Sequence, residues 1–170
     1  MAIVPIIRYP HACLEQVARP VDATSAETAL LARDLLDTLR AAPGLGITAS
    51  HVGQPLRLVV IDLHDGAGAH VYANPEVIWH ADDTATMEEG SLSMPGIHAP
   101  VTRPARVRVR YDRPDGTVAE DEACGLLSAC LQHEIDQTNG LFWTRRLSRL
   151  RRERALRRYA RLEREHEGNG

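Results

Sequence analysis

The pattern of apolar and polar positions begins with one amphipathic helix. Apolar residues recur at the three- and four-residue spacing that lines one face of a helix, at Ala32, Leu35, Leu36 and Leu39. Just before them, Thr24-Ser25-Ala26-Glu27 fits a capping box, in which polar side chains satisfy the free N–H groups of a helix start. Pro43-Gly44 predicts that the helix has ended, and Gly44-Leu45-Gly46 predicts a tight loop whose backbone approaches another group closely.

Short strands are predicted for the middle of the chain. Residues 57–62 are almost continuously apolar and predict a buried strand, whereas 106–111 alternate strictly and predict a half-exposed one. Turn residues at Pro114-Asp115-Gly116 predict a hairpin onto 117–120. Further strands are expected at 69–73, ended by Asn74-Pro75, and at 77–80. Proline and glycine residues make 88–100 look like a loop.

Two more helices complete the predicted elements. The first runs roughly from Glu122 to Thr138 and ends at Asn139-Gly140, with an apolar stripe at Leu126, Leu127, Cys130 and Leu131. The second runs from Ser148 to about Glu165. Antiparallel strands with helices at both ends define the α+β class. We expect a single domain, with residues 1–147 as its body and 148–170 as a C-terminal helix and tail that belong to it.

Composition limits where the protein acts. Of the 170 residues, 44% are hydrophobic, yet no apolar run approaches the ~20 residues that a membrane helix needs. The first seven residues lack a positively charged start and are interrupted by Pro5, so we predict no signal peptide and a cytoplasmic location. Cys13, Cys124 and Cys130 are too few and too irregular for a disulfide framework, and we expect reduced, buried thiols.

Charge is distributed unevenly along the chain. All 20 basic residues are arginines, and ten of them lie between 145 and 164 against two glutamates, a local net charge of +8. Since the whole chain carries −3, the remainder carries −11. The last helix therefore has two interpretations. It is either a solvated face with pairs such as Glu153–Arg157, or a surface that contacts RNA phosphates.

Candidate chemistry is concentrated in His133-Glu134-Ile135-Asp136-Gln137. Residues four apart lie on one face of a helix, so His133 and position 137 could bind one ion. Glu134 would then stand beside that ion as a general base, which is the logic of the H-E-x-x-H zinc motif. Here the second histidine is replaced by Gln137.

Three segments together resemble peptide deformylase, in the same order and spacing. They are Gly44-Leu45-Gly46-Ile47-Thr48-Ala49-Ser50-His51, then Glu89-Gly90-Ser91-Leu92-Ser93, then Gln132-His133-Glu134-Ile135-Asp136-Gln137. The likeness runs from Arg8 through Gly140-Leu141-Phe142-Trp143 into the last helix. It implies antiparallel sheets around a central motif helix, and hydrolysis of the N-formyl group from the starting methionine of new polypeptides. It also implies a ribosome contact through the terminal helix.

The family's functional positions can be carried over residue by residue. Its Fe²⁺ or Zn²⁺ is held by a Cys and two His, which fall on Ser91, His133 and Gln137 here. Its acid/base glutamate falls on Glu134, and the glutamine that helps hold the formyl oxygen falls on His51. The remaining matches are the oxyanion-donating N–H of Leu92, the close-approach glycine Gly46, and the methionine-pocket positions Leu45, Leu126 and Ala129.

The substitutions weaken the metal site. A cysteine thiol ionises near pH 8.5 to a thiolate that binds zinc or iron strongly, whereas a serine hydroxyl is a neutral, poor donor. The amide oxygen of Gln137 is a hard donor that suits Ca²⁺ or Mg²⁺ better. Without a metal, Glu134 has no water of lowered pKa to deprotonate.

Several interpretations stay open at this stage. The chain is a deformylase of weakened or altered activity, a pseudoenzyme that binds peptide N-termini or the ribosome, or a hydrolase of another N-formyl substrate. His51, His133 and Glu134 could form a relocated metal site, or His51 could simply hydrogen-bond Ser91. Ser91 could also be a nucleophile with His51 or His133 as its base. Expected partners are formylated peptide N-termini and, through the Arg-rich terminal helix, the ribosome, and neither a membrane nor DNA.

Overall fold

The computed structural model describes residues 2–167 and has the predicted α+β class. Its α-helices are α1 (Ala26–Arg40), α2 (Gly125–Thr138) and α3 (Arg149–Glu167). Three short 3-10 helices span Ala12–Glu15, Ala49–Val52 and Trp143–Arg146. The strands are β1 (Gly46–Thr48), β2 (Leu58–Ile61), β3 (His70–His80), β4 (Thr84–Ser91), β5 (Met94–Pro104), β6 (Arg106–Asp112) and β7 (Val118–Cys124).

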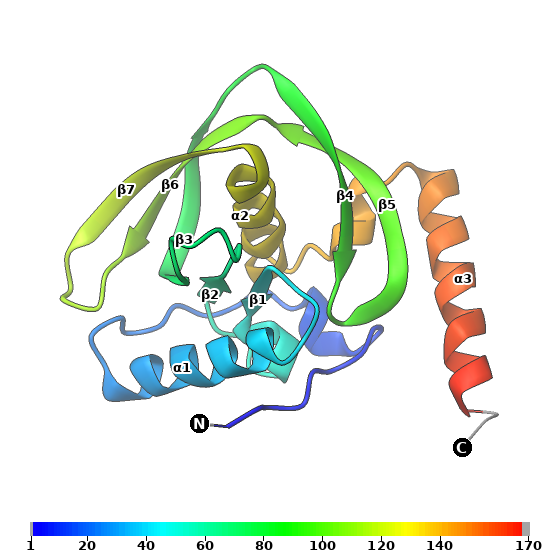
Figure 1. Cartoon of the computed structure of the whole chain (residues 1–170), viewed down its shortest axis with the longest axis horizontal. Helices are drawn as coiled ribbons and strands as arrows, with labels where there is room; N and C mark the ends of the chain where they lie inside the picture. The colour runs from blue at the N-terminus through cyan, green and yellow to red at the C-terminus, as the bar shows by residue number, and fades with distance from the viewer. Residues whose placement is uncertain (1, 168–170) are drawn as a thin grey trace.

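The strands form two antiparallel sheets with α2 between them. One sheet has the order β1-β2-β3-β6-β7, and the other is the β4–β5 ribbon. Helix α2 contacts strands of both sheets, α1 packs on β1 and β2, and α3 packs on β5. Figure 1 shows α2 in the centre of the fold and α3 along the outer side of β5. The motif helix is therefore central, as the resemblance implied.

Helix α1 begins where a hydroxyl caps it, one residue later than the predicted capping box. Ser25 is the N-cap, and its Oγ accepts the N–H of Thr28 at 3.1 Å. The Thr24 hydroxyl donates instead to Asp22, at 2.7 Å. The buried side of the helix includes Leu35 and Leu39, which pack against Ile47, Leu58 and Val60.

The two strands predicted at 69–73 and 77–80 are wrong, because they are parts of one strand, β3. Its pairing with β6 shifts register between Ala73 and Glu76, so the Asn74-Pro75 pair sits in a bulge. Asn74 has a left-handed φ of 51°, a conformation that asparagine tolerates. Its side chain is held by the backbone N–H and C=O of Val21.

The predicted loop at 88–100 is also wrong, because it forms most of the β4–β5 ribbon. Proline is tolerated in a strand whose nitrogen faces an unpaired edge, and a two-stranded ribbon has such an edge on each strand. The hairpin turns between Ser91 and Met94, which pair with each other. Strand β1 of the first motif and strand β5 of the ribbon both contact α2.

Helix α2 begins at Gly125 rather than near Glu122, since β7 continues to Cys124 and pairs there with Arg106. Helix α3 agrees with its predicted bounds within two residues. It contributes Ala155 and Tyr159 to a buried cluster with Met94, Phe142 and Trp143.

The described cysteines are free, as predicted, but Cys13 alone is fully buried. Cys124 is exposed, so its predicted burial is wrong, because it lies at the end of the edge strand β7. No helix within residues 2–167 is long and apolar enough to cross a membrane.

Candidate active site

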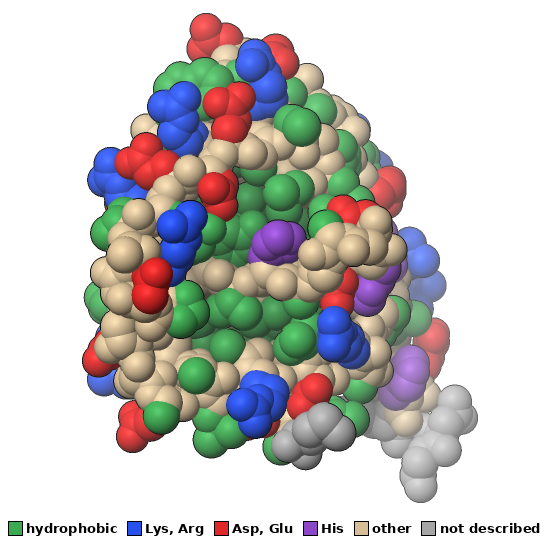
Figure 2. Space-filling view, turned by 60° about the vertical axis from the view of Figure 1, so that its left-hand side comes forward, with side chains coloured by type: hydrophobic (Ala, Val, Ile, Leu, Met, Phe, Trp, Pro, Cys, Tyr) green, Lys and Arg blue, Asp and Glu red, His purple; other side chains and the backbone are tan. Residues whose placement is uncertain are grey.

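A pocket of about 550 Å³ lies where the loop after α1, the β4–β5 hairpin and α2 meet. Figure 2 shows one hollowed face of the molecule with hydrophobic side chains gathered in the hollow. The pocket walls include all three positions predicted for a methionine side chain, Leu45, Leu126 and Ala129. The polar end of the pocket brings together most of the predicted site residues, Gly46, His51, Ser91, Leu92, His133 and Glu134.

Glu134 is held against a glycine backbone. A Cβ added to Gly46 would lie 2.6 Å from Glu134 Oε1, so only glycine leaves room for this carboxyl group. Glu134 is 5% exposed, and its Oε2 has no hydrogen-bond partner among residues 2–167. Burial raises the pKa of this carboxyl to about 7; the charge of Glu89 adds to the effect, and that of His133 opposes it. The close approach predicted for Gly46 is therefore an approach to the acid/base residue.

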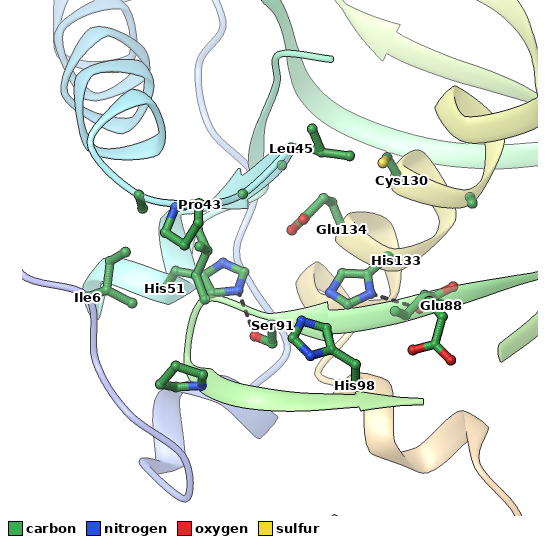
Figure 3. A pocket seen from close by; sticks show the side chains of 18 of the residues that line it. Ile6, Pro43, Leu45, His51, Glu88, Ser91, His98, Cys130, His133 and Glu134 are labelled. Atoms are coloured by element: carbon green, nitrogen blue, oxygen red, sulfur yellow. Dashed lines mark hydrogen bonds and ion pairs between the residues drawn. The ribbon is translucent and has the colours of Figure 1, made fainter. Parts of the chain in front are cut away.

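His133 is oriented by a second carboxylate. Its Nδ1 lies 2.9 Å from Glu89 Oε2, which leaves Nε2 as the ring nitrogen free to face the pocket. Burial alone would lower the pKa of His133, but the hydrogen bond to Glu89 and the charges of Glu134 and Glu89 raise it above its ordinary value. Figure 3 shows the His133 and His51 rings, Ser91 and the Glu134 carboxyl directed toward one space.

A buried ion-pair chain fixes Glu89 in turn. Arg103 donates from Nε and Nη2 to the two oxygens of Glu89, at 2.6 and 2.9 Å, and from Nη1 to Asp136 at 2.8 Å. Asp136 also receives two hydrogen bonds from Arg146. Although burial opposes it, these donors and His133 lower the pKa of Glu89 to about 2. Arg103 is buried and does not line the pocket, so it acts inside the protein by holding Glu89 and Asp136.

His51 has a fixed tautomer. The backbone N–H of Thr48 donates to His51 Nδ1 at 3.0 Å, so in the neutral ring the proton resides on Nε2. Burial, helped by the charge of His133, lowers the pKa of His51 to about 3, which keeps the ring neutral. Nε2 faces Ser91 Oγ at 3.5 Å. His51 thus offers an N–H donor at this end of the pocket, as the glutamine of the family does, and not a lone pair.

This tautomer argues against two hypotheses drawn from the sequence. A relocated metal site would need a lone pair on His51 Nε2, and His51 as base for a Ser91 nucleophile would need the same lone pair. Within residues 2–167, no group of three His, Cys, Asp or Glu side chains could hold a metal ion. The simpler interpretation, a hydrogen bond between His51 and Ser91, agrees with the geometry.

The family's three metal-ligand positions do not fit an iron or zinc ion here. Gln137 is 2% exposed, does not line the pocket, and donates its amide N–H to the carbonyl of Leu14. Ser91 Oγ, a neutral oxygen, accepts the N–H of Ser93 at 3.1 Å. His133 is thus the one strong zinc or iron ligand of the three.

Sequence reasoning missed three contributors to the site. Glu89 and Asp136 orient His133 and Arg103 from buried positions, and no spacing rule marks a carboxylate as an orienting group. His98 lines the exposed mouth of the pocket, next to Gly90 across the ribbon. A loop at 88–100 has no pairing register, so the sequence alone does not place His98 across from Gly90.

Comparison with known proteins defines the class that this fold and site indicate. The profile of the polypeptide deformylase family matches residues 3–153. A "peptide deformylase-like" protein of Rhizobium meliloti is 50% identical over 164 residues, which cover 96% of this chain and 95% of that one. A peptide deformylase from Legionella pneumophila superposes with a TM-score of 0.90 at 36% identity, covering 98% of both chains.

A third similar protein, a peptide deformylase from Synechococcus elongatus, was solved in complex with actinonin. It has a TM-score of 0.86 and 35% identity, over 94% of this chain and 89% of that one. The chain belongs to the peptide deformylase family, so the family membership implied by the three motifs is confirmed.

Proposed function

We propose that this protein holds the N-terminal residue of a peptide in its pocket and deformylates it far more slowly than family members that keep all three metal ligands. The apolar walls at Leu45, Leu126 and Ala129 suit an unbranched side chain such as methionine. The donors at the polar end, His51 Nε2–H and the backbone near Leu92, suit a carbonyl oxygen. The Synechococcus relative with bound actinonin supports the view that this fold accommodates small ligands.

One observation supports the proposal of reduced activity, namely the loss of two strong metal ligands. Gln137 does not line the pocket and commits its amide N–H to Leu14, while Ser91 contributes a neutral oxygen that already accepts a hydrogen bond. A site with one imidazole and no thiolate gives up several kcal/mol of the ~10–16 kcal/mol that strong zinc sites reach. Glu134 keeps its place as a proton carrier, but this ligand set would hold a water-activating metal only weakly.

The experiment compares the protein with the variant Ser91→Cys/Gln137→His. Metal content after purification and turnover of a formyl-methionyl peptide are measured on both. We expect substoichiometric zinc and iron and turnover at least ~10³-fold below the double variant, which is the range for loss of a central catalytic group. Stoichiometric metal with equal turnover in the unchanged protein would refute the proposal. An inactive double variant that binds metal would show that the pocket has diverged as well.

A second candidate function is favoured by α3. Four exposed arginines of this helix line a hollow of about 480 Å³ beside Leu162: Arg154, Arg157, Arg158 and Arg161. None of these four forms an ion pair with another described residue, whereas Arg149 pairs with Glu153. We propose that this surface contacts ribosomal RNA phosphates, because unpaired arginines on one helix face gain most from an anionic partner.

Removing α3 would also remove Ala155 and Tyr159 from the core, so truncation is a poor test of this surface. Changing the four arginines to glutamine leaves the core intact. We expect this variant to lose ribosome co-sedimentation and its salt dependence. A control with Arg106, Arg108 and Arg110 of β6 changed to glutamine should pellet normally. Equal pelleting of both variants would eliminate this function.

A further inference from the structure

A second hollow, of about 750 Å³, is lined mainly by α2 and the second half of β3. It shares no lining residue with the candidate active site. Helix α2 contributes Gln132, Asp136 and Asn139, which stand at positions i, i+4 and i+7 and therefore on one face. Since a helix rises about 1.5 Å per residue, Gln132 and Asn139 are about 10 Å apart along the axis. The hollow thus has two separate ends.

One end carries a positive charge that no carboxylate within residues 2–167 neutralises. Arg57 donates from Nη1 to Asn139 Oδ1 at 2.8 Å and from Nη2 to the carbonyl of Pro75 at 2.6 Å, and both acceptors are neutral. Arg146 binds Asp136 through Nε and Nη2, which leaves its Nη1 free. Because Asp136 and Asn139 are one helical turn apart, the two guanidinium groups that they anchor lie at the same end. Their remaining N–H groups, with the amide N–H of Asn139, suit an oxyanion.

The other end offers a buried acceptor that lacks a donor. Gln132 is 8% exposed, and its Nε2 donates to the carbonyl of Pro104 at 2.9 Å and to Ser128 Oγ at 3.0 Å. These two acceptors fix which atom of the amide is the nitrogen. No residue within 2–167 donates to the Oε1 atom, although Gln132 lines the hollow. A ligand that brings an N–H donor to this end is therefore favoured.

The walls between the two ends are suited to a flat ring. Val77, Pro104 and Ile135 line this part, and apolar walls with few polar groups are typical of small-molecule sites. Glu76 stands at the rim and would repel an anion. It is exposed, however, and lies opposite Arg110 in the register of β3 and β6, which offsets its charge.

We propose that this hollow binds a nucleoside monophosphate whose base carries an exocyclic amine. Its phosphate accepts hydrogen bonds from Arg57, Arg146 and Asn139, and its amine donates to Gln132 Oε1. A phosphate has three acceptor oxygens for these three donor groups, whereas the carboxylate of a short peptide has two. The ribose and base span the distance between the ends and place the ring faces against the apolar walls.

The test measures the affinities of CMP, UMP and cytidine for the unchanged protein by calorimetry, in a phosphate-free buffer. CMP and UMP have the same size and charge, but cytosine presents an amine donor where uracil presents a carbonyl acceptor. We expect CMP to bind about tenfold more tightly than UMP, because uracil leaves Gln132 Oε1 facing another acceptor. We also expect CMP to bind about tenfold more tightly than cytidine, which lacks the phosphate.

The variant Arg57→Gln should lower the affinity of CMP to that of cytidine and leave cytidine unchanged. The matched control Arg40→Gln removes a surface arginine that pairs with Asp62 on another face, and it should bind CMP normally. Thermal unfolding checks that both variants fold. If Arg57→Gln does not fold, the three ligands compared on the unchanged protein decide the question.

Three results would overturn the inference. The first is no binding of CMP to the unchanged protein. The second is equal affinity for CMP and UMP, since the Gln132 end would then read no donor. The third is CMP binding that persists in Arg57→Gln, which would place the nucleotide on the arginines of α3. Triglycine, a zwitterion, is the remaining probe: binding of triglycine in place of CMP, lost in Arg57→Gln, would assign the hollow to peptide carboxylates instead.

Discussion

Replacing Arg103 by methionine should destabilise the protein by about 3–5 kcal/mol, the cost of breaking a buried ion pair by removing one partner. Arg103 is 5% exposed and donates hydrogen bonds to both carboxylate oxygens of Glu89 and to one of Asp136. Asp136 keeps Arg146, and Glu89 keeps His133, so the lower end of the range is expected. A methionine side chain fills much of the same volume, which limits the packing loss.

The lowered pKa of Glu89 gives a magnitude for all the groups that hold this carboxylate, His133 as well as Arg103. A fall from 4.5 to about 2 corresponds to about 3 kcal/mol of stabilisation of the ionised form. Since the folded pKa lies below the unfolded one, this contribution is fully present above pH 4.5 and is lost as the pH falls toward 2. The stability difference between the protein and Arg103→Met should therefore shrink across that window.

The assay is urea unfolding at pH 7 and at two acidic pH values, with Arg106→Met as control. Arg106 pairs with Asp83 on the surface, where both side chains are about half exposed. Such pairs contribute at most about 1 kcal/mol. If Arg103→Met costs no more than Arg106→Met, or if its cost is unchanged at low pH, the buried chain does not stabilise the site as we infer.

Three further predictions concern the pocket itself. Gly46→Ala should lower the free energy of unfolding by about 1–3 kcal/mol and weaken peptide binding, because its methyl group displaces the Glu134 carboxyl. The control Gly44→Ala meets the flexible tip of Leu92 and should cost less. Thermal unfolding and peptide titration compare the two variants. Glu134→Gln should stabilise the free protein at pH 8. The folded pKa of Glu134, about 7, lies above its unfolded value of 4.5, so the stability of the unchanged protein falls as the pH rises from 4.5 through 7. Unchanged unfolding of the variant at pH 8 would contradict this. His51→Gln should keep peptide affinity, because an amide N–H replaces the Nε2–H of the ring. It should also reduce the stability that the protein loses as the pH falls from 6.5 to 3, because the neutral buried ring has a lowered pKa of about 3. Loss of peptide affinity would mean that the ring does more than donate a hydrogen bond.

The sequence was sufficient for the fold class, for the helices and for most of the pocket. Helical spacing placed α1 and α3, and three motifs in register placed Gly46, Ser91, His133 and Glu134 around one space. The predicted strand bounds were wrong where strand pairing overrode a local sequence rule. A bulge carried β3 through Asn74-Pro75, and a two-stranded ribbon accommodated the prolines of 88–100.

Side-chain direction could not be predicted from spacing. Position 137 lies one helical turn from His133, yet the amide N–H of Gln137 donates to the carbonyl of Leu14, which is 123 residues away in the chain. The tautomer of His51 depends on a single backbone N–H at Thr48. Both features decide the chemistry of the site, and both depend on contacts that exist only once the chain has folded.

The most direct test of the account is peptide binding before and after metal removal. Calorimetry with Met-Ala-Ser is performed on the protein as purified, after exhaustive chelation, and after addition of zinc. Binding of equal affinity in all three states is predicted, because the His51 donor and the apolar walls form the site without a metal. Binding that disappears on chelation and returns with zinc would contradict the account.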